Sequence, residues 1–427
     1  MIMKALLSNT LNGFAKKTRS TLLLSGLLNE PFVAMFALLP FILRQDLDAN
    51  LFQISVFTML KPVMAVFSFY WGFGLARQSQ TLRSNLIWGW VLARLSFLFV
   101  LFFSGPWFVI FSAGLYCLFH RAITPAFMEI LHINLQKKSS HTLFTLSSIL
   151  NWMLSMIIGL YAGKILDHNA NTWNWLFAIT AALSLSAIVL YKKTPITGET
   201  SHLSIDKPVK TFSLKQTIMQ PLKDSFYLLK IRKDFLHFQM GFMAGGFGLM
   251  IIIPASILFY ADIIRIDHHA MSMSRLIYMG LGFILFSPLW RQLLKKWSMA
   301  KLTALVCFSF ALFPIILVCS LYAKFWLFAA LFFYGVAQAG SHLVWHLSGP
   351  AYADQENSAL YSTVNVLTVG LRGLIGPLFG MLLCKLFGPI TTLIIGSFIC
   401  LIGSVIMQIP LFAKTKSSSL QKPIKNL

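Results

Sequence analysis

Residues 302–322 read LTALVCFSFALFPIILVCSLY and contain no charged side chain. An α-helix needs about 20 mostly apolar residues to cross the hydrocarbon core of a bilayer. This stretch therefore predicts a transmembrane helix. Runs of the same kind recur along the chain, separated by short segments with proline, glycine or charged residues. Their recurrence predicts a protein that crosses the membrane many times.

The composition indicates the same class. Apolar residues make up 57% of the 427 residues and charged residues only 11%, whereas a soluble domain has about 25% charged residues. Lipid must therefore cover much of the surface. In lipid every backbone N–H and C=O must be satisfied internally, which leaves helices and closed barrels. Because the apolar runs are longer than the strands of about 10 residues that build barrels, we expect an all-α polytopic membrane protein.

The proline, glycine and charged residues between the apolar runs predict twelve transmembrane helices in two groups of six. The long polar stretch Lys192–Phe235 separates the groups, and its part Ser213–Leu229 has an amphipathic pattern. We predict an N-terminal six-helix bundle (1–191), a cytoplasmic central loop (192–235), a C-terminal six-helix bundle (236–412) and a cytoplasmic tail (413–427). The predicted spans are 20–43, 51–75, 84–104, 107–130, 142–165, 173–191, 236–261, 271–291, 300–322, 325–348, 358–384 and 388–412.

The net charge of +22 reflects membrane topology rather than nucleic-acid binding. Most Lys and Arg fall in the tails and in the loops on one side of the predicted membrane, which indicates that both termini are cytoplasmic. We expect no nucleic-acid partner, an uncleaved first span and residence in a bacterial plasma (inner) membrane. The few basic residues on the opposite side are Arg44, Lys164, Arg265, Arg275, Lys324 and Lys385.

The two halves show traces of an internal repeat in their fifth spans. Three polar positions of span 5 match three of span 11 at one constant offset, and two glycines follow in the same phase in each span. Duplication of a six-helix unit explains this shared phase, and chance is the alternative. The matched polar positions are Ser148, Asn151 and Ser155 with Asn365, Thr368 and Arg372.

Several motifs resemble those of a known transporter family. Residues 72–77 (GFGLAR) keep Gly72 and Arg77 of the signature G-x-x-x-D-R-x-G-R, with Ala76 in place of the aspartate. Residues 376–380 (GPLFG) match the antiporter signature G-P-x-x-G, although on span 11 rather than span 5. With the six-plus-six topology, the sequence resembles the major facilitator superfamily of secondary transporters. The resemblance implies two pseudo-symmetric bundles around a central cavity, and a cytoplasmic gate at Gly72 and Arg77.

Glu30 is the one acidic residue near the middle of a predicted span. It lies roughly 15 Å from the cytoplasmic end of span 1, and Arg121 lies at a similar depth in span 4. The resemblance likens Arg121 to the buried arginine of proton-coupled antiporters. We predict that the two form a pair facing the cavity, which responds to protons. The alternative is a permanent salt bridge that fixes packing.

Span 10 carries Gln338, His342 and His346 at helical spacing on one face. The stripe predicts a cavity lining, with hydrogen bonding to neighbouring backbone groups as the alternative. A metal site is not expected, because two histidines lack a third ligand. Asn151 and Arg372 are further candidates for the substrate and proton pathway, with hydrogen bonding between helices as their alternative. Lys61 and Arg94 also lie inside spans, where snorkelling or a structural role competes with substrate contact.

These features predict a secondary active transporter that moves a small polar or anionic solute by alternating access. Coupling of that transport to protons is one form of this prediction. We expect a monomer in the bilayer, with a small-molecule substrate and no cofactor, metal or catalytic residues. One alternative is a non-transporting membrane protein, either a sensor or a lipid-modifying enzyme, but the loops are short and poor in acids. Another is an exporter of lipids or drugs.

Overall fold

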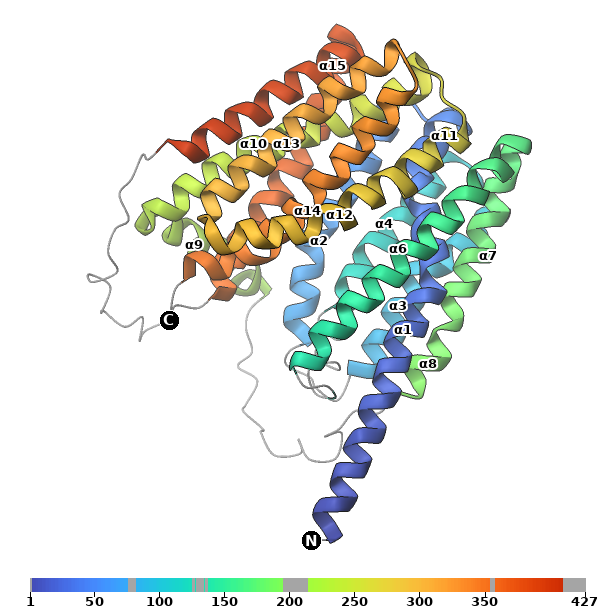
Figure 1. The fold of residues 1–427 in the computed structure, drawn as a ribbon, viewed down its shortest axis with the longest axis vertical. Helices are drawn as coiled ribbons and strands as arrows, with labels where there is room; N and C mark the ends of the chain where they lie inside the picture. The colour runs from blue at the N-terminus through green and yellow to red at the C-terminus, as the bar shows by residue number, and fades with distance from the viewer. Residues whose placement is uncertain are drawn as a thin grey trace.

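The structure is a computed structural model that describes residues 2–75, 82–124, 127, 134, 137–194, 214–353 and 358–409. These residues are almost entirely helical (Figure 1). The helices are α1 (Ile2–Gln45), α2 (Leu51–Leu75), α3 (Leu82–Leu98), α4 (Pro106–Ala122), α6 (Lys137–His168), α7 (Trp173–Ser186), α8 (Ile188–Lys192), α9 (Leu214–Ile231), α10 (Lys233–Leu258), α11 (His268–Ser272), α12 (Met279–Lys296), α13 (Met299–Val318), α14 (Phe325–Ala353) and α15 (Ser358–Gln408).

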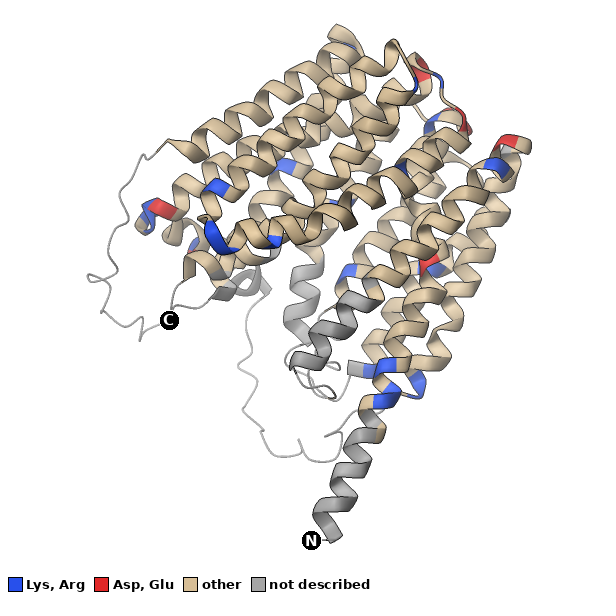
Figure 2. Cartoon of the chain, in the orientation of Figure 1, with Lys and Arg blue, Asp and Glu red and all other residues tan. Residues whose placement is uncertain are grey.

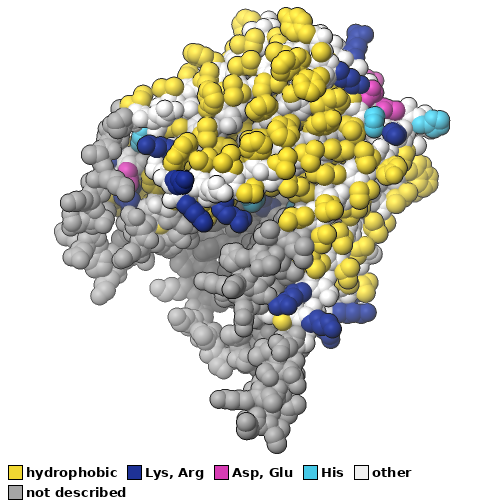
Figure 3. All heavy atoms as spheres, in the orientation of Figure 1, with side chains coloured by type: hydrophobic (Ala, Val, Ile, Leu, Met, Phe, Trp, Pro, Cys, Tyr) yellow, Lys and Arg dark blue, Asp and Glu magenta, His cyan; other side chains and the backbone are white. Residues whose placement is uncertain are grey.

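The helices have the lengths and surfaces of membrane-spanning segments. Within the described residues, nine are long and apolar enough to cross a bilayer. Large apolar side chains such as Phe102, Trp175 and Phe398 point outward, and apolar side chains dominate the face seen in Figure 3. Most of the Lys and Arg lie at the ends of the helices (Figure 2). The protein is therefore an integral membrane protein, and the count of twelve spans stays a prediction.

Several of the helices are interrupted by a glycine or by a π-helical turn. The two last predicted spans form one element, α15, interrupted at Gly388, whose φ of 80° is a left-handed conformation that glycine adopts without strain. Two π-helical turns, η4 (Phe259–Ile263) and η5 (Met273–Tyr278), flank the connection from α10 to α12. Such turns often occur at functional sites. The predicted amphipathic segment 213–229 is confirmed as a helix, α9.

The helices gather into two groups, one on each side of α9 in the sequence (Figure 1). In the first group α1 packs on α6 and α7, and α3 packs on α4 and α7. In the second group α15 packs on α10 and α13, and α14 packs on α12 and α13. Contacts between the groups run from α2 to α15 and from α6 to α11 and η5. These contacts place any site between the groups within reach of both.

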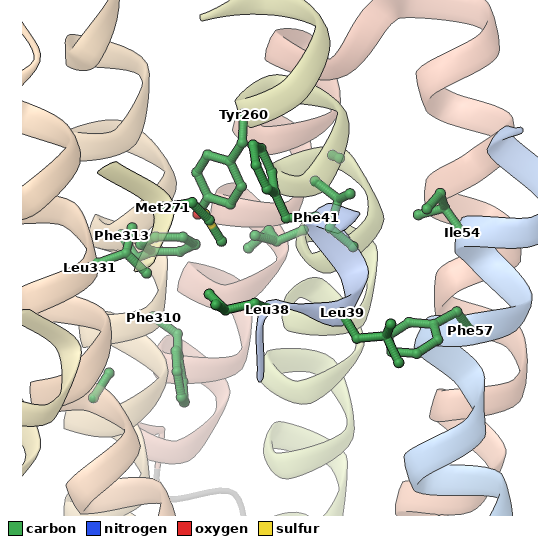
Figure 4. Packing of buried hydrophobic residues seen from close by; sticks show 14 of the residues in the cluster. Leu38, Leu39, Phe41, Ile54, Phe57, Tyr260, Met271, Phe310, Phe313 and Leu331 are labelled. Atoms are coloured by element: carbon green, nitrogen blue, oxygen red, sulfur yellow. The ribbon is translucent and has the colours of Figure 1, made fainter. Parts of the chain in front are cut away.

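Aromatic side chains fill the middle of the first group. Phe32 of α1 meets Phe97 of α3 and Tyr116 of α4, each with a ring-centroid distance of 5.0 Å. Between the groups, Leu38 and Phe41 of α1 lie toward the side chains that surround Tyr260 of the second group (Figure 4). The apolar core thus continues from one group into the other at this level.

Candidate functional site

Glu30 lies inside the first group, between α1 and α6. Its side chain is buried, and the Ser155 hydroxyl of α6 donates a hydrogen bond to its Oε1. Asn151, one turn before Ser155, packs against Gly26 of α1, and its Oδ1 is enclosed without a hydrogen-bond partner. Two predicted pathway residues, Glu30 and Asn151, are thus brought to one helix interface.

The predicted pair between Glu30 and Arg121 is wrong for this conformation. Arg121 makes no ion pair with Glu30, and its guanidinium instead lies 5.8 Å from the ring centroid of Trp345 on α14. The reason is rotational, because equal depth in the membrane does not fix which face of α4 points toward α1. Arg121 instead faces the second group of helices.

The cation that packs beside the Glu30 region is Arg94 of α3. It is fully buried, and its Nη2 donates to Asn29 Oδ1 at 2.8 Å. The same Asn29 oxygen accepts from Ser184 Oγ at 2.7 Å. The guanidinium also lies 3.5 Å from the Trp90 ring centroid. This network ties α1, α3 and α7 together, which favours the structural alternative for Arg94.

Arg372 has a comparable place in the second group. It is buried, its Nη1 donates to the Phe242 carbonyl of α10, and its guanidinium lies 4.3 Å from the Phe242 ring centroid. Asn365 and Thr368, on the same helix, hydrogen-bond with Gln239 of α10. Polar positions of α15 therefore face α10, as Asn151 and Ser155 of α6 face α1. This shared orientation matches the repeat that the sequence predicts.

The polar stripe of α14 is described in part. Gln338 donates from Nε2 to the Tyr334 hydroxyl at 2.9 Å. His342 is exposed, and its ring lies 6.2 Å from that of Phe283. The surroundings of the His346 side chain lie outside what the structure describes. No group of three or more His, Cys, Asp or Glu in the described part of the chain could hold a metal ion.

The predicted gate motif stays a prediction. Gly72 lies in α2, but its surroundings lie outside what the structure describes, and Arg77 lies outside the described residues altogether.

Charged contacts between the two groups, which the sequence did not single out, lie at the end of the molecule that holds α11 (Figure 2). Arg44 at the end of α1 binds Asp262 of η4, with Nε 2.9 Å from Oδ1 and Nη2 2.9 Å from Oδ2. His268 at the start of α11 lies between Asp46, just after α1, and Asp167 of α6. We call these five residues the junction. The sequence feature that could have predicted the junction is the clustering of acidic residues at the ends of apolar runs.

The geometry of His268 indicates its protonation state. Its Nε2 lies 2.9 Å from Asp46 Oδ2, and its Nδ1 lies 3.0 Å from Asp167 Oδ1. A neutral imidazole has a single N–H, whereas two carboxylate acceptors need an N–H on both nitrogens. The doubly protonated imidazolium therefore fits this position. His268 bridges the two groups fully only while it keeps both protons.

Backbone contacts bring the two groups close beside the junction. A Cβ atom at Gly163 of α6 would lie 2.6 Å from His269 Cα, so only glycine permits this approach. The Ser272 hydroxyl of α11 donates to the Gly159 carbonyl of α6 at 2.7 Å. Burial raises the pKa of Asp267, but the Ala270 N–H and Lys324 outweigh it and hold that pKa below its ordinary value. Asp267 thus caps α11 as a carboxylate.

A cavity of about 70 Å³ lies between α1 and the second group. Phe41 lines it from α1, and Tyr260, Arg275 and Tyr334 line it from the second group. Phe41 and Tyr260 are labelled in Figure 4. The Arg275 Nε itself is enclosed by the protein and has no hydrogen-bond partner in the described residues. Arg275 falls inside the predicted span 271–291, where nothing in the sequence indicates that it lies beside a cavity.

The comparison with known families decides the identity. The profile of the Major Facilitator Superfamily matches residues 22–371, most of the chain. The chain belongs to the major facilitator superfamily. No curated protein is similar enough in sequence to match.

Solved structures of transporters share the fold of this superfamily member. The nucleoside transporter NupG has a TM-score of 0.70 and 13% identity, over 91% of this chain and 98% of that one. A POT family transporter in complex with 5-aminolevulinic acid has a TM-score of 0.67 and 14% identity, over 91% and 95%. The peptide transporter POT in complex with sulfate has a TM-score of 0.67 and 13% identity, over 92% and 93%. At such identities the likeness shows the fold alone. Membership of the major facilitator superfamily and the fold shared with these transporters together indicate a secondary transporter.

Proposed function

We propose that this superfamily member moves a small polar or anionic solute across the bacterial plasma membrane by alternating access. The junction is the observation that carries the proposal. At one end of the molecule it adds a few charged side-chain contacts to the packing between the two groups of helices, and such contacts can break and re-form as rigid groups rock. The charge distribution of the sequence predicts that this end is extracytoplasmic.

The polarity of the solute is supported by what lies between the groups. Arg121, Arg275 and the polar stripe of α14 give that space hydrogen-bond donors, which an apolar lipid or drug would leave unsatisfied. The similar solved structures are those of a nucleoside transporter, a peptide transporter and a transporter in complex with 5-aminolevulinic acid. Nucleosides, peptides and 5-aminolevulinic acid are all polar solutes.

Glu30 is the proposed proton site. It is a buried carboxylate with one neutral hydrogen-bond donor, Ser155, and no basic partner in the described residues. A carboxylate in that setting can take up a proton without breaking an ion pair. Proton binding there would change the α1–α6 contact, and both of these helices reach the junction through Asp46 and Asp167.

The test is transport by the purified protein in liposomes. A panel of radiolabelled nucleosides, dipeptides, amino acids, carboxylates and phosphate esters is supplied with and without an inward proton gradient. We expect accumulation of one polar class above the level of protein-free liposomes, and a larger accumulation with the gradient. Protein that stays folded in the liposomes yet takes up no member of the panel, even in counterflow, would contradict the proposal.

A further inference from the structure

The turn from α12 to α13 carries a cluster of exposed cations. Residues 291–301 contain four Lys and Arg, whereas residues 268–353 contain no Asp or Glu. Within the described residues, none of the four cations takes part in an ion pair. We call these four residues the cationic corner. They are Arg291, Lys295, Lys296 and Lys301, and all of them are exposed.

The cationic corner is a short turn at the ends of two helices that are long and apolar enough to cross a bilayer. The first of them ends at Lys296 and the second begins at Met299. The Ser298 hydroxyl caps α13, because it accepts a hydrogen bond from the Lys301 N–H at 3.4 Å. Trp297, between the two helices, is 41% exposed. Tryptophan at the end of a membrane span is typical of the level at which lipid headgroups lie.

The exposed apolar face of each of these helices leads to a cation. On α12, Leu285 and Leu289 are exposed, and Lys296 follows Leu289 by seven residues, which is about two turns along the same face. On α13, Phe308 is exposed and follows Lys301 by the same spacing. Figure 3 shows Lys and Arg side chains along an edge of the apolar surface. Faces that lipid tails cover thus end in cations at the level of the lipid phosphates.

Membrane topology alone does not account for this arrangement. The positive-inside rule requires Lys and Arg in a cytoplasmic loop, and it is satisfied wherever in the loop they lie. Here the cations continue the helix faces that meet lipid, where a long side chain can cover apolar surface with its stem and extend its charge to the headgroups. Clusters of roughly four to eight cations at the cytoplasmic end of a span are typical of sites for anionic lipid headgroups.

We propose that the cationic corner binds the phosphate of an anionic phospholipid in the cytoplasmic leaflet. The ammonium and guanidinium groups contact the phosphate, and the acyl chains of the same lipid lie along the exposed faces of α12 and α13. An acidic protein would meet the same charges, but it would not use the apolar faces that continue from them. The proposal is independent of the solute and of the transport function.

The test uses the full-length protein in detergent, with phosphatidylglycerol or phosphatidylcholine of the same acyl chains added. Thermal unfolding is followed by tryptophan fluorescence, and native mass spectrometry counts the bound lipids. We expect phosphatidylglycerol to raise Tm more than phosphatidylcholine does, and the difference to shrink as sodium chloride is added. Lys296→Gln and Lys301→Gln should each lower the apparent affinity for phosphatidylglycerol about fivefold, and the double variant should lower it further.

Two variants serve as controls. Lys296→Arg keeps the charge and should keep the response to phosphatidylglycerol. Lys385→Gln removes an exposed lysine that also lies beside exposed apolar side chains, those of Leu386 and Phe387. Lys385 is the only Lys or Arg within residues 373–413 of the sequence, so its loss should leave the response unchanged. Because all the substituted lysines are exposed, Tm without added lipid should stay close to that of the wild type.

A response to phosphatidylglycerol that is the same in wild type and in the double variant would overturn the proposal. Equal stabilisation by the two lipids would also overturn it, because the acyl chains alone would then account for binding. Soluble glycerol phosphate or polyglutamate that stabilises the protein as much as phosphatidylglycerol does would contradict a lipid ligand, and would indicate a free anion or an acidic protein instead.

Discussion

The junction predicts how far single substitutions shift the balance between joined and separated helix groups. His268 and Asp46 have side chains that are 10% and 6% exposed, and a hydrogen bond to a charged group contributes about 1.5–3 kcal/mol. Asp46→Asn keeps the shape but removes the charge. The ratio of separated to joined protein should therefore rise roughly 10- to 100-fold, since 1.4 kcal/mol corresponds to a factor of 10.

The second contact of the junction should contribute less. Arg44 and Asp262 are 28% and 36% exposed, and ion pairs that water reaches contribute about 0.2–1 kcal/mol. Arg44→Gln should therefore raise the same ratio by no more than about fivefold. The matched control is Asp48→Asn. Asp48 is exposed and has a φ of 48°, a left-handed conformation that asparagine tolerates.

The reporter is Ser272→Cys in a protein without its five native cysteines. Ser272 is fully buried where α11 meets α6, so a membrane-impermeant thiol reagent reaches it only when the groups separate. Its labelling rate then follows the separated fraction. As pH rises, His268 loses its second proton, and labelling should accelerate relative to a cysteine at exposed position 295. Equal rates in Asp46→Asn, Asp48→Asn and the parent protein would refute this account of the junction.

Three further outcomes follow from the structure and the sequence. Glu30→Gln keeps a partner for Ser155 but cannot titrate, so concentrative uptake in liposomes should be lost while counterflow exchange persists; unchanged pH-dependent accumulation would make Glu30 structural. Gly163→Ala places a methyl against the α11 backbone and should cost the joined state about 1–3 kcal/mol, seen as faster thiol labelling, whereas Gly105→Ala, with open space around it, should not. A cysteine introduced within 192–235 should resist impermeant reagents in intact cells, and ready labelling would reverse the predicted topology.

The sequence predicted the helices better than their rotation. The lengths of the apolar runs and the polar residues between them were sufficient to place most spans, because lipid forces each apolar run into a helix. The pair of Glu30 with Arg121 was wrong because depth along an axis follows from counting residues, whereas rotation about that axis is set by packing. Ser155, which does bind Glu30, had been singled out through the internal repeat. Periodicity thus carried more information about neighbours than depth did.

The contacts of the junction could not be predicted from the sequence for a different reason. Asp46, Asp167 and His268 lie at the ends of apolar runs, where charged residues are expected in any membrane protein. Only the fold shows that these ends come from different groups and meet. The face on which Arg275 lies could not be predicted, because the π-helical turn η5 shifts that face relative to an α-helical count.

The charged contacts of the junction hold the two groups together. There, acids and bases from the two groups attract each other, which favours the joined state. A protein that must visit both conformations requires that neither be strongly favoured. The joining contact should therefore be one that can be weakened, and loss of the second imidazole proton of His268 weakens it. Raising the pH and Asp46→Asn should then change the labelling of Ser272→Cys in the same direction. Because both act on the His268–Asp46 contact, their effects should not add, and labelling in Asp46→Asn should respond less to pH than labelling in the parent protein.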